Sequence, residues 1–304
     1  MEGDLTDFLL GGILVLLLAQ LGIFGWFLHA SYRIRRVFGG GGRSPMGSDL
    51  YSVFRWIKRI GALLVDKRGV ARLLLVQVEP GLNRIIADVS GGGQVTALLQ
   101  HMCARAPLQP GQRLVLDIGA NDGFQGSHSF NFIQLGWMAA LVEPNPEAYE
   151  EILANVAGKR LQGAEHRVVT RNVAVTEQTC GPVTLYLRGW RYTASSLVDD
   201  GADRTEVEVP GESVSGLLSG IEAEFRERGL MRSLPKEPGV LSIDVEGLDY
   251  EVLKGFMSCG LRPCYVLVEA RMGPDRFDQL MEPLGYDRFA HFHDDLLYYR
   301  PPSE

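Results

Sequence analysis

Short apolar runs alternate with longer segments of helical periodicity over residues 111–304. This alternation is typical of βα units, so it predicts an α/β domain with a Rossmann-like, doubly wound, mostly parallel sheet. The buried strands are the clearest elements because their apolar runs end abruptly at glycines and carboxylates. We expect strands at 114–118, 139–142, 167–175, 183–187, 240–243 and 265–268, a terminal hairpin at 289–292 and 296–299, and helices at 130–135, 147–155, 214–228 and 250–256.

A longer apolar run, Phe8 to Leu28, lies near the N-terminus and is interrupted only by one glutamine and small glycines. Its length is sufficient to cross the hydrocarbon core of a bilayer, so residues 1–30 are predicted to form a tail and one transmembrane helix. A cleaved signal peptide is the alternative. That alternative requires a basic start, whereas the chain begins with Glu2, Asp4 and Asp7 and has no Lys or Arg before the apolar run.

Basic residues follow the apolar run at Arg33, Arg35, Arg36 and Arg43. By the positive-inside rule, they place the N-terminus outside and the rest of the chain in the cytoplasm. A lumenal orientation is the alternative.

Residues 31–110 are predicted to form a basic juxtamembrane linker and a helical cap. The consecutive glycines Gly39 to Gly42 predict a flexible joint. Residues 51–65 have helical spacing with a basic face, which fits a helix packed on the domain or a helix lying on anionic lipid. Residues 71–106 are expected to be helical or mixed, with a helix at 95–102, and the role of 51–106 stays open.

Composition bounds the function. The 304 residues can bury one good-sized core, and the formal net charge of −7 argues against a general nucleic-acid binder. Four cysteines without any C-x-x-C spacing predict neither a zinc site nor a disulfide framework, so free thiols are expected. The oligomeric state is not determined by these features.

The candidate chemistry is centred on Asp117 to Gly123, where the first strand breaks into glycines and carboxylates. Ligands of doubly wound domains bind outside the carboxyl ends of the strands, so this turn is expected to hold a cofactor. The turn lacks the G-x-G-x-x-G spacing of dinucleotide sites, and Asp117 and Asp122 would repel a pyrophosphate. The same carboxylates favour the ammonium and sulfonium of S-adenosylmethionine, so an NAD-linked oxidoreductase is disfavoured.

Glu143 ends the second predicted strand, 26 residues after Asp117. A carboxylate at this place can accept hydrogen bonds from both hydroxyls of a ribose. A solvated acid at a strand end is the alternative. The preceding turn and the intervening helix favour the ribose-binding role.

Several motifs follow one another along the chain in a recognisable order. They are Val115 to Gly123, Val142 to Pro146, Asn172 to Val175, Gly181, Ser195 to Leu197, Ile243 to Gly247 and Leu253 to Gly255. With these motifs the chain resembles, over about Leu114 to Arg300, the FkbM-type methyltransferases, a branch of the class I S-adenosylmethionine-dependent enzymes. The resemblance implies that Asp117, Gly119 and Asn121 line the methionine end of the cofactor, that Glu143 holds the ribose, and that Asn172 to Ala174 lie near the adenine.

Asp244 and Glu246 are the candidate catalytic residues, because they stand two apart at a strand end and a carboxylate near the methyl group can serve as base or orienter. Glu246 capping the next helix is the alternative. The other candidates for proton transfer are His128, His291 and His293. Glu269 makes a divalent metal with Asp244 and Glu246 conceivable, but no ligand spacing compels it, so no metal is expected.

These features predict a membrane-anchored S-adenosylmethionine-dependent O-methyltransferase whose acceptor is a small molecule, a glycan or a lipid. Residues 188–196 mix aromatic, basic and hydroxyl side chains, which fits a lid over the site or an ordinary exposed loop. The alternative function is a non-catalytic, membrane-tethered protein that binds S-adenosylmethionine or acts as a scaffold. No nucleic-acid partner is expected.

Overall fold

The computed structural model describes residues 73–79, 82–105, 107–161, 163–176, 181–187, 195–198, 205–271 and 273–302. All of them belong to one compact unit, Lys58–Glu304. The predicted transmembrane helix at 8–28, the glycine joint and the predicted helix at 51–65 lie outside the described residues. Within the described ranges, no helix has both the length and the apolar character needed to span a membrane.

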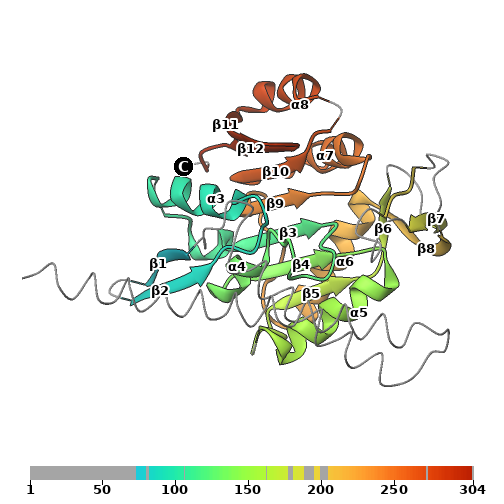
Figure 1. Cartoon of the computed structure of the whole chain (residues 1–304), viewed down its shortest axis with the longest axis horizontal. Helices are drawn as coiled ribbons and strands as arrows, with labels where there is room; N and C mark the ends of the chain where they lie inside the picture. Colours follow the sequence, from blue (N-terminus) through green and yellow to red (C-terminus); the bar gives the residue numbers. More distant parts are fainter. Residues whose placement is uncertain are drawn as a thin grey trace, which may run out of the picture. The chain divides into compact units, whose positions relative to one another are not determined.

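A seven-stranded sheet forms the centre of the domain (Figure 1). Its order is β11-β12-β10-β9-β3-β4-β5, in which β10, β9, β3, β4 and β5 run parallel and the terminal hairpin β11-β12 adds antiparallel pairs. The predicted α/β class with a mostly parallel sheet is therefore confirmed. The strands are β3 Leu114–Ile118, β4 Met138–Val142, β5 Val168–Arg171, β9 Val240–Ile243, β10 Tyr265–Glu269, β11 Asp287–Phe292 and β12 Asp295–Tyr299.

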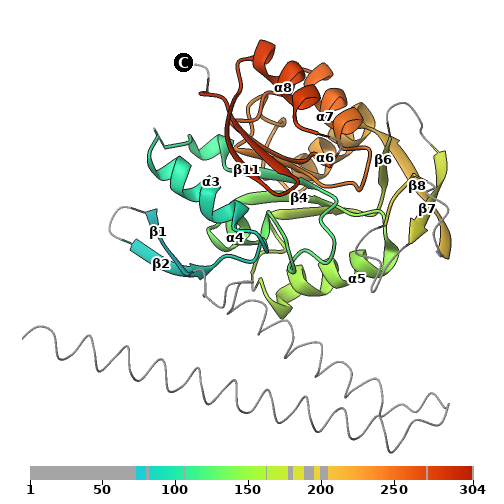
Figure 2. The same cartoon turned by 45° about the horizontal axis from the view of Figure 1, so that its top comes forward.

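Helices cover both faces of this sheet, as Figure 2 shows. Alternate residues of one strand point to opposite faces, so Leu114, Leu116 and Ile118 of β3 join the core under α6, α7 and α8, whereas Val115 joins the core under α3, α4 and α5. This two-sided burial explains why the central strands are mostly apolar instead of alternating between apolar and polar residues. The helices are α3 Gln94–Cys103, α4 Phe130–Gln134, α5 Pro146–Ala154, α6 Val214–Glu227, α7 Asp249–Ser258 and α8 Asp275–Met281, with short turns at Pro110–Gln112, Asn155–Lys159 and Glu282–Leu284.

A small three-stranded sheet is inserted between β5 and α6, with the order β6-β8-β7. The expected single strand at 167–175 is wrong, because the chain leaves the large sheet after Arg171 and enters the small one at Ala174. The expected strand at 183–187 is confirmed within β7, whereas β8 was not expected because charged and polar residues alternate with its valines. The three strands of the small sheet are β6 Ala174–Thr176, β7 Gly181–Leu187 and β8 Thr205–Ser213.

The part of the chain before residue 111 contributes a hairpin and a helix. Strands β1 Leu73–Glu79 and β2 Leu82–Ala87 pair antiparallel, where helical or mixed structure was expected. The expected helix at 95–102 is confirmed as α3, whose Val95 and Leu98 are fully buried in the domain core. Cys103, Cys259 and Cys264 are free thiols, as expected for the described cysteines.

Candidate functional site

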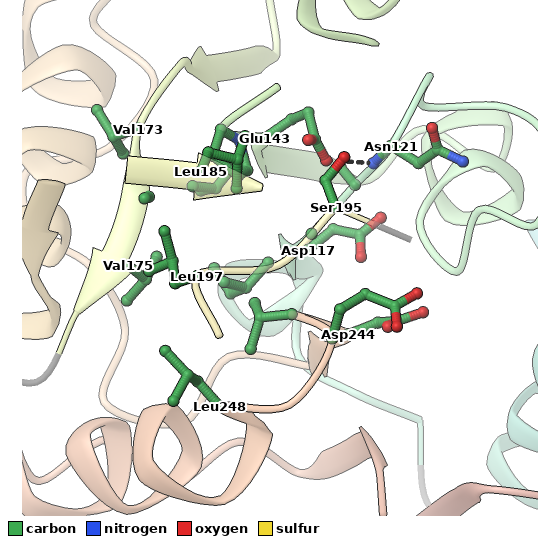
Figure 3. Close-up of a pocket in the computed structure, with 18 of the residues that line it drawn as sticks. Asp117, Asn121, Glu143, Val173, Val175, Leu185, Ser195, Leu197, Asp244 and Leu248 are labelled. Carbon is green, nitrogen blue, oxygen red and sulfur yellow. Dashed lines mark hydrogen bonds between the residues drawn. The ribbon is translucent and has the colours of Figure 1, made fainter. Parts of the chain in front are cut away.

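A cavity of about 180 Å³ lies where the carboxyl ends of β3, β4 and β9 meet. Polar groups line one side and apolar groups the other: in Figure 3, the carboxylates of Asp117 and Asp244 point to the same side, away from Val175 and Leu248. The cavity therefore has the two-sided character that a partly charged, partly aromatic ligand requires.

The turn after β3 forms the floor of the cavity. Gly119 and Ala120 donate backbone hydrogen bonds to the carbonyl of Val142, at 2.9 and 3.0 Å, so the turn is fixed against the end of β4. Gly119 has a φ of 86°, and a Cβ there would lie 1.7 Å from the carbonyl oxygen of Asp244. Only glycine permits this approach between the ends of β3 and β9.

Asn121 and Asp122 shape the same turn in different ways. Asn121 borders the cavity and adopts a left-handed φ of 51°, which asparagine tolerates better than most residues. The Asp122 carboxylate accepts the backbone N–H groups of Phe124 and Gln125, at 2.9 and 2.7 Å. Asp122 thus stabilises the turn and is not among the cavity-lining residues.

Glu143 lies at the end of β4 and is 7% exposed. Its Oε2 accepts the backbone N–H of Asn121 at 2.8 Å, and its Oε1 accepts that of Asn145 at 2.9 Å. Burial raises the pKa of Glu143 to about 7, against the opposing effect of these two hydrogen bonds. Each carboxylate oxygen retains a lone pair, so the group can accept two further hydroxyls.

Asp117 belongs to a buried polar network beneath the turn. Its Oδ2 accepts the hydroxyl of Ser129 at 2.5 Å, and burial raises the pKa of its carboxyl. His128 lines the cavity, and its Nδ1 lies 3.0 Å from the hydroxyl of Ser242 on β9. Ser129 and Ser242 thus orient Asp117 and His128, although neither serine belongs to a distinctive sequence pattern.

Asp244 directly follows β9 and borders the cavity, and its Oδ1 is buried without a hydrogen-bond partner among the described residues. Burial, together with the neighbouring carboxylates of Glu269 and Glu246, raises the pKa of Asp244 well above its usual range. Glu246 also borders the cavity, with a φ of 55°, and its Oε2 pairs with Arg271 at 2.5 Å. The N-cap residue of α7 is Leu248, which makes no side-chain cap hydrogen bond, and the carboxylate of Glu246 is directed toward Arg271.

The apolar wall comes from the small sheet and the segments beside it. Val173, Val175, Leu185, Leu197 and Leu248 line this side, and Figure 3 shows them grouped together. Such a wall suits an aromatic ring, which gains most of its binding free energy from buried apolar area.

The two residues predicted near an adenine have different positions. Ala174 lies among the residues of the apolar wall. Asn172 is not among the cavity-lining residues, because its amide donates to the carbonyls of Glu143 and Pro144, at 2.8 and 3.1 Å. Asn172 therefore fastens the end of β5 to the end of β4, behind the carboxylate of Glu143.

The structure brings together most of the predicted site residues. The cavity is lined by Asp117, Gly119, Asn121, Glu143, Ala174, Asp244 and Glu246, and by His128. His291 and His293 are exposed and do not line it, and nearly all of the predicted loop at 188–196 lies outside the described residues. Sequence reasoning missed Arg271, whose only signal is its place two residues after a strand that ends in an acid.

The chemical groups that line this site fit S-adenosylmethionine. The cofactor carries two cationic groups, a ribose and an adenine, and the site offers buried carboxylates, a strand-end Glu143 with free lone pairs, and an apolar wall. A seven-stranded, mostly parallel sheet with this cavity at the ends of β3, β4 and β9 is the arrangement of a methyltransferase-type α/β domain.

The comparison with protein-family models agrees with this class. The family model for the methyltransferase FkbM domain matches residues 117–299, and the chain belongs to this family. The crystal structure of a fibrillarin/Nop5p complex is similar with a TM-score of 0.33 and 14% identity, covering 67% of this chain and 81% of that one. No curated protein matches the chain. The predicted family is confirmed, and membership implies S-adenosylmethionine as the cosubstrate.

Proposed function

We propose that the chain is an O-methyltransferase that acts at a membrane on a small-molecule, glycan or lipid acceptor. The observation that carries the proposal is Asp244, a carboxylate that borders the cavity, has an unpartnered buried oxygen and has a raised pKa. A carboxylate of raised pKa at this place is suited to receive the proton of an acceptor hydroxyl.

Different residues of the cavity bind different parts of the cofactor. We assign the ribose hydroxyls to Glu143, the methionine end to Asp117, Gly119 and Asn121, and the adenine to the wall that includes Ala174. Asn172 acts as a positioning residue, through the carbonyls that it holds next to Glu143.

The reaction needs little covalent participation by the protein. When bound, S-adenosylmethionine supplies a methyl group on a sulfonium, and the electrons of the broken carbon–sulfur bond remain on sulfur. Asp244 accepts the hydroxyl proton as the acceptor oxygen gains the methyl group, and Glu246, held by Arg271, orients the acceptor.

A labelled cofactor tests the reaction. Full-length protein in detergent is incubated with methyl-labelled S-adenosylmethionine and with lipid, glycan and small-molecule extracts. We expect label in a product that survives mild base, as a methyl ether does and a carboxyl methyl ester does not. Asp244→Asn is expected to lose most transfer and to keep binding S-adenosylhomocysteine. Cofactor binding without transfer to any extract would favour the non-catalytic alternative.

The membrane part of the proposal is supported by the apolar run at 8–28 and the arginines that follow it. Protease treatment of sealed vesicles of known orientation tests the predicted topology. A cytoplasmic domain is digested when the cytoplasmic face is outward, whereas protection in that orientation would indicate a lumenal enzyme. Release of the chain by carbonate washing would contradict the transmembrane anchor.

A further inference from the structure

Three carboxylates converge on the side of the cavity where β9 and β10 end. They belong to Asp244, which follows β9, to Asp249, which begins α7, and to Glu269, which ends β10. Each offers one oxygen, and these oxygens lie within 4.8 Å of one another. From the sequence, a metal held by Asp244, Glu246 and Glu269 was conceivable but none was expected. The structure turns Glu246 toward Arg271 and brings Asp249 into the group.

Two oxygens of this group are buried and have no partner. Glu269 is only 7% exposed; its Oε1 accepts from Nε of Arg271 at 2.8 Å, and its Oε2 has no hydrogen-bond partner among the described residues. Oδ1 of Asp244 is also buried and has no hydrogen-bond partner among the described residues. A carboxylate oxygen removed from water without a partner is costly, so two of them in one cluster indicate a missing ligand.

The charge around these oxygens indicates the sign of that ligand. Five carboxylates influence one another electrostatically, and the guanidinium that the structure places against them is 53% exposed and already occupied by two of them. A bare acidic cluster of this kind favours a small cation of high charge. The carboxylates are those of Asp244, Glu246, Asp249, Glu269 and Asp295, and the guanidinium is that of Arg271.

We propose that Asp244, Asp249 and Glu269 bind a divalent cation of the oxygen-preferring class, such as Mg²⁺ or Ca²⁺. Three oxygens within 4.8 Å of one another have a common centre no more than about 2.8 Å from each. Small movements therefore bring them to the ligand distances of Ca²⁺, about 2.3–2.6 Å, or of Mg²⁺, about 2.0–2.1 Å. The oxygens of Asp249 accept the N–H groups of Val245 and Gly247, at 2.8 and 3.0 Å, and each retains a lone pair for the ion.

The location gives such an ion a role in choosing the acceptor, and this step rests on the proposed O-methyl transfer. Asp244 borders the cavity, so an ion held by three protein oxygens leaves coordination positions that water or an acceptor oxygen can fill. A cation lowers the pKa of a coordinated hydroxyl, and Asp244, which offers the ion one oxygen, can receive the released proton on its other oxygen. Acceptors with two neighbouring oxygens, such as vicinal hydroxyls, are therefore the favoured class.

Mn²⁺ alone serves as the probe, because electron paramagnetic resonance measures the free ion directly. Full-length protein in detergent, freed of chelators, is titrated with Mn²⁺ at neutral pH. We expect one saturable site per chain, with Mn²⁺ displaced by Mg²⁺ or Ca²⁺. Glu269→Gln and Asp244→Asn should each weaken Mn²⁺ binding at least tenfold. The control Glu251→Gln, a 40% exposed acid in the first turn of α7, should leave it unchanged.

S-adenosylhomocysteine binding, measured on the same samples, reports that each variant is folded. It also separates the two proposals. No saturable Mn²⁺ site in a wild-type protein that binds S-adenosylhomocysteine would overturn the cation site and leave the methyltransferase intact. Equal Mn²⁺ affinity in wild type and Glu269→Gln would also overturn it. Failure of the wild type to bind S-adenosylhomocysteine would contradict the proposed function.

Discussion

Replacing Gly119 by alanine tests whether the cavity floor depends on the close approach of β3 and β9. The φ of 86° costs an alanine about 1–2 kcal/mol. Its Cβ would lie 1.7 Å from the carbonyl oxygen of Asp244, where ordinary contact begins at 3.4 Å, so the strand ends must separate. Separation weakens the hydrogen bond from Asp244 N to Ile118 O, at 2.9 Å, and disturbs the core, which adds about 2–4 kcal/mol.

Gly136 provides a matched control. It has a φ of 89°, it is exposed, and a Cβ added there meets nothing within 4 Å, so Gly136→Ala isolates the cost of the backbone conformation. We expect Gly136→Ala to lower the free energy of unfolding by about 1–2 kcal/mol and Gly119→Ala by about 3–6 kcal/mol. For a domain of this size, the Tm should fall by about 2–8 °C in Gly136→Ala and by about 6–24 °C in Gly119→Ala.

Thermal and urea unfolding of the full-length protein, followed by tryptophan fluorescence, measures both changes. S-adenosylhomocysteine titration of the same samples is expected to show unchanged affinity for Gly136→Ala and a clear loss for Gly119→Ala. Equal destabilisation by the two substitutions would refute the close-approach argument, because it would leave only the shared backbone cost.

Three further predictions concern the polar groups of the site. The pKa of Glu143 is about 7 folded against 4.5 unfolded, so the folded state binds more protons between these values and stability falls by about 3 kcal/mol as pH rises through this window. Glu143→Gln should remove that difference between urea titrations at pH 4 and pH 8; an unchanged pH slope would contradict it. Ser129→Ala leaves Oδ2 of Asp117 short of a buried hydrogen bond and should cost about 1–3 kcal/mol in urea unfolding, whereas a cost near zero would remove Ser129 from the network. Arg171 of β5 pairs with Glu212 of β8 at 2.5 Å, but both are partly exposed, so a double-mutant cycle should give a coupling below about 1 kcal/mol.

The sequence predicted the large sheet well because its strands are buried on both faces. Mostly apolar runs such as Leu114–Ile118 and Val240–Ile243 are easy to recognise as buried strands, because carboxylates and glycines mark their carboxyl ends. The small sheet was harder, because β8 is mostly exposed on one side and Thr205–Ser213 consequently contains acids and a proline. The hairpin β1-β2 was not predicted, because helical or mixed structure was expected over residues 71–106.

The candidate site, too, could be predicted only in part from the sequence. The strand-end acids Asp117, Glu143 and Asp244 could be predicted because parallel strands bring their carboxyl ends to one edge. The groups that orient them could not. Ser242 lies in β9 and contacts His128, whereas Asp249 lies at the start of α7 near Glu269. Both contacts depend on tertiary packing that has no local sequence pattern.

The small sheet has a consequence for how this kind of domain diversifies. Its strands supply one wall of the cavity, whereas the acidic side is built from the ends of β3, β4 and β9. Insertions or exchanges between β6 and β8 can therefore reshape the wall while the acidic edge keeps its geometry. A family built in this way can acquire new molecular targets by editing one short stretch of chain, and grafting that stretch between relatives is a direct route to altered selectivity.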